Sequence, residues 1–135
     1  MRPMRILLVD DNAEFLDAAT RFLAVQPRIE IVGKIFSGRE AVNQTPTLKP
    51  DFVLMDLMMP EMDGLEATRL LKQLPDPPAV IVVSLHDDQS FRIAAQGAGA
   101  DGFLPKRQLS KQLMRLLEKR IPGTPDNTSD PLNSA

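Results

Sequence analysis

The feature that most constrains the fold of this chain is an apolar run, residues 53–55, that ends in the carboxylate of Asp56. Turn-forming residues flank it, with Pro50 and Asp51 before it and residues 60–64 after it. A continuous apolar run of this length is typical of a strand buried on both faces, because a strand with one solvated face alternates polar and apolar residues. A charge at the end of such a strand is costly to desolvate unless another group pairs with it. The alternative is that Asp56 merely caps the turn that follows.

Five strand-like runs alternate with helical patterns along the chain. The expected strands are residues 5–9, 29–36, 53–56, 79–83 and 101–104. Between and after them, apolar residues recur at helical spacing, with helix starts near residues 12, 37, 63, 88 and 109. Pro46 and Pro50 are expected to end the second helix, and Gly97 and Gly99 the fourth. The fourth helix carries few large apolar residues, so we expect it to be the least firmly anchored.

This alternation predicts an α/β fold class: a five-stranded parallel sheet with helices on both faces, in a (βα)5 doubly wound arrangement with right-handed crossovers. With 135 residues, 43% of them hydrophobic, the chain suits one domain with a substantial core. We assign that domain to residues 1–121. Residues 122–135 offer little to bury and are predicted to be a flexible tail or a truncated linker.

Composition excludes several classes of function. A net charge of -2 lacks the positive excess with which proteins bind the phosphate backbone of nucleic acids. We therefore expect no direct nucleic-acid binding by this domain and infer that its partners are proteins. The absence of cysteine from the sequence excludes disulfides and thiolate metal sites and is compatible with a reducing compartment. The apolar runs are far shorter than the roughly 20 residues of a membrane helix. We therefore predict a cytoplasmic protein without membrane association.

Polar residues gather where the expected strands end. Because the carboxyl ends of parallel strands meet at one edge of a sheet, these residues should form one site. The set consists of Asp10, Asp11, Asp56, Ser84 and Lys106.

Three carboxylates at one edge need a counter-charge, since each pair repels by roughly 4 kcal/mol at 4 Å and an effective dielectric of 20. One lysine cannot neutralise them. A divalent cation with oxygen ligands can, and Mg2+ is preferred over Zn2+ because the chain has one histidine and no cysteine. With Mg2+ present, Asp56 can act as a nucleophile toward phosphorus, while Lys106 stabilises the transferred oxygens and Ser84 offers a hydrogen bond. The product would be an aspartyl phosphate.

The ordered set of these residues resembles the receiver domain of two-component response regulators over about residues 4–121. The matching residues are Asp10-Asp11, Asp56, Met59-Pro60, Asp63-Gly64, Ser84, Phe103 and Lys106. The resemblance implies a flavodoxin-like strand order, 2-1-3-4-5. It also implies that Asp11, Asp56 and the backbone carbonyl of Met58 hold Mg2+, with Asp10 acting mainly through water.

The same resemblance implies a switch. Asp56 would accept a phosphoryl group from a sensor histidine kinase or a phosphotransfer protein, after which Ser84 moves toward the phosphoryl group and Phe103 turns inward. The face formed by the fourth helix, fifth strand and fifth helix would then control a downstream effector protein or output domain, or form a homodimer. Such a domain is not an enzyme in the usual sense, although it promotes its own phosphotransfer and autodephosphorylation.

The chain departs from the family pattern at two positions. Many members follow the lysine with a cis proline, whereas here Arg107 follows Lys106 and Pro105 precedes it. Leu85 stands after Ser84, where the family often has a small side chain, so access to the acyl phosphate should be narrower. His86, the one histidine, is expected to be a loop residue or to tune the lifetime of the phosphate.

Two other classes of function stay open on the sequence. One is a pseudo-receiver, an interaction module that is never phosphorylated. The other is a phosphatase with an aspartyl-phosphate intermediate, although the Asp-x-Asp-x-Thr pattern of haloacid-dehalogenase-like enzymes is absent at residues 56–60. The output is also open between a stand-alone regulator and the front part of a transcription factor.

Overall fold

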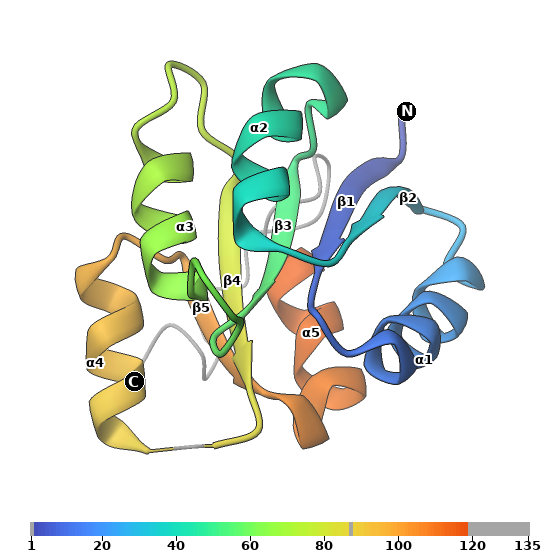
Figure 1. Cartoon of the computed structure of the whole chain (residues 1–135). Coiled ribbons are helices and arrows are strands. Elements are labelled where there is room, and N and C mark those ends of the chain that lie inside the picture. The colour runs from blue at the N-terminus through green and yellow to red at the C-terminus, as the bar shows by residue number, and fades with distance from the viewer. Residues whose placement is uncertain (1, 87, 119–135) are drawn as a thin grey trace.

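The computed structural model describes residues 2–86 and 88–118 and shows a parallel sheet between two layers of helices (Figure 1). The strands are β1 (Met4–Val9), β2 (Ile29–Ile35), β3 (Phe52–Asp56), β4 (Ala79–Ser84) and β5 (Gly102–Pro105). The helices are α1 (Ala13–Ala24), α2 (Gly38–Leu48), α3 (Gly64–Lys72), α4 (Gln89–Gly97) and α5 (Leu109–Glu118), with a 3-10 turn, η1 (Lys106–Gln108), before α5. The strand order β2-β1-β3-β4-β5, parallel throughout, confirms the predicted fold class. The predicted tail and the end of the last predicted helix lie outside the described residues.

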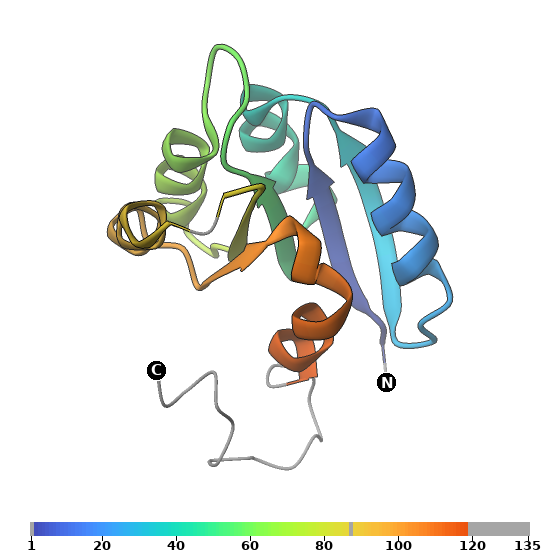
Figure 2. The same ribbon diagram turned by 90° about the horizontal axis from the view of Figure 1, so that it is seen from below.

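Helices cover both faces of the sheet, which explains why the inner strands β1, β3 and β4 are mostly buried and apolar, whereas the edge strand β2 carries exposed Glu30 and Lys34 (Figures 1 and 2). Alternate residues of a strand point to opposite faces. In β1, Ile6 and Leu8 enter the core under α1 and α5, whereas Leu7 and Val9 enter the core under α2, α3 and α4. With both faces covered, the carboxyl edge is where strand-end side chains can meet a ligand.

Side-chain caps start three of the helices at the places that the sequence predicts. The side-chain oxygens of Asn12, Ser37 and Asp63 accept hydrogen bonds from backbone N–H groups three residues later, at 3.1, 3.2 and 2.9 Å. Each bond satisfies one of the donors that a helix leaves unpaired at its N-terminus. The cap of α1, Asn12, closely follows Asp10, so it also fixes the chain that leaves β1. The cap of α3, Asp63, comes after a longer turn that begins at the end of β3.

The prediction that Pro46 ends the second helix is wrong, because α2 continues through it to Leu48. Proline removes one backbone hydrogen bond, and contacts near the end of the helix offset that loss. Lys49 adopts a left-handed conformation, with φ 51°, and its N–H donates to the carbonyl of Thr45 at 2.8 Å. The guanidinium of Arg5, on β1, donates to the carbonyl of Leu48 at 2.7 Å. The last turn is thus held by a strand that is distant in sequence.

The weak anchoring expected for α4 is confirmed. Ala95 is its one fully buried residue, and the side chain of Asp88 makes no cap hydrogen bond with the described residues. Gly97 still belongs to the helix, whereas Gly99, with φ +97°, takes the left-handed position that ends the segment. Helix α4 is therefore the helix that can move with the least loss of buried apolar surface.

Gly64 allows α3 to begin directly against the backbone of the central strand. Its N–H donates to the carbonyl of Leu57 at 2.9 Å. A Cβ at this position would lie 2.0 Å from the backbone oxygen of Asp56, which is far inside van der Waals contact. The Asp-Gly pair at the start of this helix therefore reflects a close approach to the backbone of Asp56.

We expect Gly64→Ala to destabilise the domain by about 2 to 3 kcal/mol, because the added methyl must displace backbone atoms. Gly97→Ala is the matched control, since it also adds a methyl within a helix but meets no atom within 4 Å. The control should be neutral or slightly stabilising, given the higher helix propensity of alanine. Urea unfolding of both variants measures the difference, and equal stabilities would contradict the close approach.

Candidate functional site

Four strands deliver polar side chains to one edge of the sheet, the lower edge in Figure 1. Strand β3 ends in Asp56, which is in register with Val83, and β4 ends in Ser84, which is in register with Pro105. Asp10 directly follows β1, and Lys106 directly follows β5. The parallel register thus brings the ends of four segments together from across the chain.

Lys106 forms ion pairs with two aspartates at this edge. Its Nζ lies 2.7 Å from Oδ2 of Asp10 and 3.3 Å from Oδ1 of Asp56. All three side chains are nearly inaccessible, with 9% of Lys106, 1% of Asp10 and 6% of Asp56 exposed. Two buried carboxyl groups therefore share one ammonium group, and the pair carries an excess of negative charge whenever both are ionised.

Asp11 completes an acidic cluster with Asp10 and Asp56. One carboxylate oxygen from each lies within 4.8 Å of the others. Oδ1 of Asp10 accepts the N–H of Asn12 at 2.8 Å, whereas its buried Oδ2 accepts no well-aligned hydrogen bond from the described residues, although Lys106 Nζ lies close to it. Under-satisfied oxygens with excess negative charge fit a small divalent cation with oxygen ligands.

The electrostatics of the site act most strongly on Asp56. Burial raises its pKa to about 7, and repulsion from Asp10 and more weakly from Asp11 acts in the same direction, while Lys106 opposes the shift. The ordinary pKa of an aspartate is near 3.8. Without a cation, the carboxyl of Asp56 therefore holds its proton up to neutral pH.

Ser84 is buried at the end of β4, the strand next to β3. Its Oγ accepts the backbone N–H of His86 at 3.0 Å. A hydroxyl that accepts one hydrogen bond still has its own hydrogen to donate. His86 is exposed, with its ring centroid 5.9 Å from that of Phe91, and makes no contact with the three aspartates among the interactions of the described residues.

Phe103 lies between the sheet and α4. Its ring is partly buried against the core under α2, α3 and α4, and the guanidinium carbon of Arg92 lies 4.9 Å from the ring centroid. This contact joins β5 to the weakly anchored α4. A movement of the ring must therefore change the surroundings of α4.

Two exposed apolar side chains follow the strand ends in sequence. Met58 and Leu85, which closely follow Asp56 and Ser84 in sequence, are 60% and 71% exposed. The backbone of Leu57, just before Met58, is fixed by bonds from its N–H to Val83 and to its carbonyl from Gly64, both 2.9 Å. Lys106 is the first residue of η1, and all described peptide bonds are trans. The fixed backbone sets the position from which the Met58 carbonyl is predicted to reach a metal ion.

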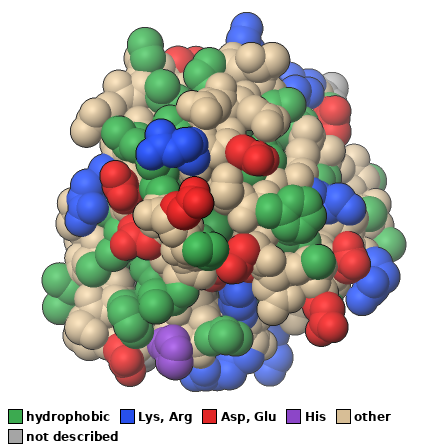
Figure 3. All heavy atoms as spheres, viewed as in Figure 1, with side chains coloured by type: hydrophobic (Ala, Val, Ile, Leu, Met, Phe, Trp, Pro, Cys, Tyr) green, Lys and Arg blue, Asp and Glu red, His purple; other side chains and the backbone are tan. Residues whose placement is uncertain are grey.

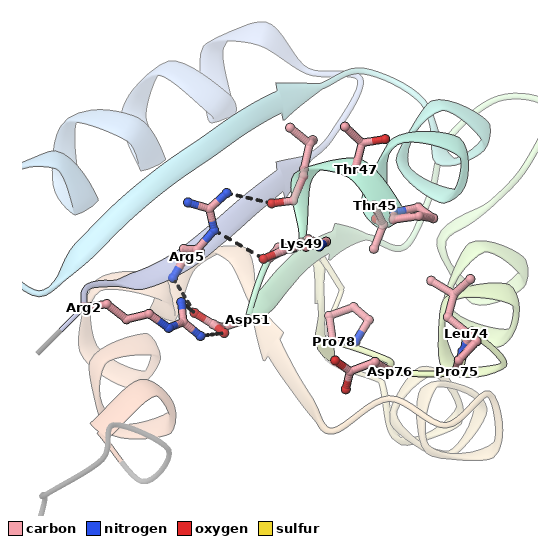
Figure 4. A pocket seen from close by; sticks show the side chains of 13 residues that line it. Arg2, Arg5, Thr45, Thr47, Lys49, Asp51, Leu74, Pro75, Asp76 and Pro78 are labelled. Carbon is pink, nitrogen blue, oxygen red and sulfur yellow. Dashed lines mark hydrogen bonds and ion pairs between the residues drawn. The ribbon is translucent and has the colours of Figure 1, made fainter.

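A hollow of about 610 Å³ lies near the opposite end of β1, around Arg2, Arg5 and Asp51 (Figure 4). Three of its charged side chains, those of Arg2, Arg5 and Asp51, are held by hydrogen bonds. Arg2 donates two hydrogen bonds to Asp51, at 2.7 and 3.0 Å, and Arg5 caps the carbonyl end of α2. These contacts hold β1, α2 and the start of β3 together, so the carboxyl edge of the sheet is a better candidate for the functional site than this hollow.

Two residues important for the site escaped the sequence argument. Gly64 was recognised as part of a motif, but its contact with the backbone of Asp56 requires coordinates. Phe15 packs on the core like the other apolar residues of α1, yet its ring also lies against the ammonium of Lys106. No sequence signal distinguishes Phe15 from the other apolar residues of α1.

Comparison with known families agrees with this geometry. The profile of the response regulator receiver domain matches residues 6–118. The chain belongs to the receiver domain family. Among solved structures, the receiver domain resembles the response regulator domain of CheB from Thermotoga maritima, with a TM-score of 0.80 and 31% identity over 87% of this chain and 96% of that one.

Curated relatives carry the same domain as part of longer proteins. The receiver domain is 36% identical to a protein-glutamate methylesterase/protein-glutamine glutaminase of Alkalilimnicola ehrlichii, over 87% of this chain and 32% of the relative. It is 35% identical to the transcriptional regulatory protein DegU of Brevibacillus brevis, over 85% of this chain and 49% of the relative. The chain thus spans half or less of these two relatives.

The family is a signalling domain, and the methylesterase activity named for some relatives belongs to another part of those longer chains.

In the part of this receiver domain that the structure describes, no helix is long and apolar enough to cross a membrane. Acidic, basic and apolar side chains are interspersed over the face formed by α2, α3 and α4 (Figure 3).

Proposed function

We propose that this receiver domain accepts a phosphoryl group on Asp56 from the phosphohistidine of a sensor kinase or a phosphotransfer protein. Asp10, Asp11, Asp56 and the carbonyl of Met58 would hold Mg2+. The observation that carries the proposal is the shared ammonium of Lys106, which lies 2.7 Å from Asp10 and 3.3 Å from Asp56 at the end of the central strand. The ion pairs place one cation beside the carboxylate that would react.

In the proposed reaction, a carboxylate oxygen of Asp56 bonds to phosphorus as the phosphorus–nitrogen bond of the donor breaks. The bonding electrons return to the imidazole nitrogen of the donor. Bound Mg2+ would supply positive charge to the phosphoryl oxygens and neutralise the acidic cluster. Lys106 stabilises the same oxygens from within the protein, and Ser84 donates a hydrogen bond to one of them.

The proposed output is a rearrangement of the surface formed by α4, β5 and α5. Ser84 would move toward the phosphoryl group, and Phe103 would turn further inward. Because the ring of Phe103 contacts Arg92 of α4, this turn would also move α4. The weak anchoring of α4 supports this. The rearranged face would bind a second receiver domain, an effector protein or an output domain, in a cytoplasmic pathway and without direct contact with nucleic acid by this domain.

Incubation with acetyl phosphate and Mg2+, followed by intact-mass measurement, tests the proposal. A mass increase of one phosphoryl group that is acid-stable and lost at alkaline pH supports a receiver. A pseudo-receiver would remain unmodified. A phosphatase would instead turn over phosphate esters, a reaction for which the described residues provide no Asp-x-Asp-x-Thr pattern. Labelling by a sensor kinase would then identify the donor.

We expect the phosphoryl mimic beryllofluoride, added with Mg2+, to shift amide NMR signals across residues 84–120. The reason is that Ser84 must reorient to reach the mimic, and the space that it vacates is next to the path of Phe103. The indole-free, tyrosine-free chain offers no simple fluorescence reporter, so NMR is the suitable measurement. Shifts restricted to the surroundings of Asp10, Asp11 and Asp56 would contradict the proposed switch.

A further inference from the structure

Lys106 contacts an aromatic ring as well as two carboxylates. Its Nζ lies 4.4 Å from the ring centroid of Phe15, in the first turn of α1. A cation within about 6 Å of a ring face is attracted by the negative charge of that face. The ammonium therefore has three attractive neighbours: Asp10, Asp56 and Phe15.

The loop that presents Asp10 also fixes Phe15. The carboxylate of Asp10 accepts the N–H of Asn12 at 2.8 Å, and the side chain of Asn12 accepts the N–H of Phe15 at 3.1 Å. Two successive hydrogen bonds thus connect the aspartate to the backbone that carries the ring. The position of the ring relative to the acidic cluster is therefore set by local bonds and not by core packing alone.

A lysine in this position requires such a contact because its side chain is long and flexible. Ordering it costs rotamer freedom, and the ammonium is strongly hydrated when it is accessible. Here 9% of the Lys106 side chain is exposed. The ring excludes water from the ammonium while still stabilising its charge, which an aliphatic side chain of similar size would not do.

We infer that Phe15 is a positioning residue for the phosphotransfer reaction, and that its ring face holds the Lys106 ammonium at the place where it meets the phosphoryl oxygens. The inference rests on the proposed function, since it assumes that Lys106 acts on those oxygens. Phe15 itself does not touch the reacting atoms. It acts through Lys106.

The chain provides a matched control for the core-packing role of Phe15. Phe22 lies seven residues later, on the same side of α1, and both rings are partly buried against the same core. Among the described residues, no cation is found over the ring of Phe22. Phe15→Leu and Phe22→Leu therefore remove the same atoms from the same layer, but only the first removes the contact with Lys106.

The position of the lysine is measured first, in metal-free protein without any reaction. The ring current of Phe15 should displace the NMR signals of the Lys106 methylene next to Nζ, with the signals assigned through Lys106→Arg. The displacement should disappear in Phe15→Leu and persist in Phe22→Leu and Phe15→Tyr. Its persistence in Phe15→Leu would overturn the inference.

The rate of phosphorylation by acetyl phosphate at saturating Mg2+ is measured next. We expect a rate roughly three- to tenfold lower in Phe15→Leu than in Phe22→Leu, with the rate recovered in Phe15→Tyr, which keeps the ring face. Mg2+ affinity should be equal in Phe15→Leu and Phe22→Leu, because the metal ligands are unchanged. A general distortion of the site by Phe15→Leu would weaken Mg2+ binding as well, and this result would overturn the positioning role.

A double-mutant cycle assigns the effect to Lys106. In a Lys106→Met background, Phe15→Leu should lower the rate no further than Phe22→Leu does. An additional loss in that background would mean that Phe15 acts by another route. Failure of the parent protein to accept phosphate would refute the proposed function, whereas equal rates for Phe15→Leu and Phe22→Leu in a phosphorylated protein would refute only the inference about Phe15.

Discussion

Asp56→Asn should carry no phosphate under conditions that label the parent protein completely. Asp56 is the carboxylate at the end of the central strand, with Lys106 Nζ 3.3 Å from its Oδ1 and two further aspartates beside it. An amide keeps the shape of the side chain but is a far weaker nucleophile toward phosphorus. Intact-mass measurement after incubation with acetyl phosphate and Mg2+ gives the labelled fraction directly.

The control for this loss is Asp17→Asn, which makes the same chemical change at an exposed position on α1. It should label as fully as the parent. Labelling of Asp56→Asn to the same extent would mean that Asp10, Asp11 or another group is the acceptor, and the assignment of Asp56 would be abandoned. Peptide mapping of the labelled parent locates the phosphate independently.

The fold was predictable from the sequence because the central strands β3 and β4 are apolar on both faces. The pattern in residues 53–56 and 79–83 excludes a sheet with one solvated side, and alternation with helices then leaves few topologies. The end of α2 was not predictable. Proline at position 46 normally ends a helix, but Arg5, about 40 residues earlier, holds the last carbonyls of α2 in place. Local patterns carry no information about such a partner.

The sequence predicts which residues gather at the site, since parallel strands end at a common edge. It does not predict how deeply each of these residues is buried or what it contacts. Asp10 and Asp11 are adjacent and chemically identical, yet Asp10 is fully buried and Asp11 is exposed. The direction in which the chain leaves β1 determines this difference. The ring of Phe15 over Lys106 is likewise a contact through space, and helical periodicity specifies only the face on which Phe15 lies.

In metal-free buffer, the stability of the parent protein relative to Asp56→Asn should fall as the pH rises from about 4 to about 8. Burial and the neighbouring aspartates raise the pKa of Asp56 to about 7, so the folded protein holds this proton at a pH where the unfolded chain has lost it. A raised pKa contributes stability that is complete below the unfolded value, near 3.8, and is lost as the pH passes through the folded value.

The expected size of this change is about 2 to 4 kcal/mol, from roughly 1.4 kcal/mol for each pH unit of the shift less a reduction for solvent at the open edge of the site. Urea unfolding with EDTA at several pH values measures it. Burial raises the pKa of Asp51, but the hydrogen bonds from Arg2 and from the backbone of Arg5 together lower it overall, so this group makes a contribution of opposite sign. That contribution is common to both proteins, so it cancels in the comparison. Parallel stability curves for the two proteins would contradict the raised pKa of Asp56.

Mg2+ should restore the stability that the parent protein loses as the pH rises, and it should do so in the parent protein alone. A ligand that binds the folded state stabilises it by about 1.4 kcal/mol at a tenfold excess over its Kd, and bound Mg2+ also removes the repulsion that disfavours ionised Asp56. Asp56→Asn lacks one of the proposed ligands and should respond weakly. Asp11→Asn separates the two effects, because exposed Asp11 is the weakest contributor to the raised pKa of Asp56 but would be a direct ligand. This variant should therefore gain little in EDTA, about 1 kcal/mol or less, and still lose most of the response to Mg2+. Equal stabilisation of all three proteins by Mg2+ would place the metal site away from this cluster, and the carboxylates would then be a structural feature of the sheet edge.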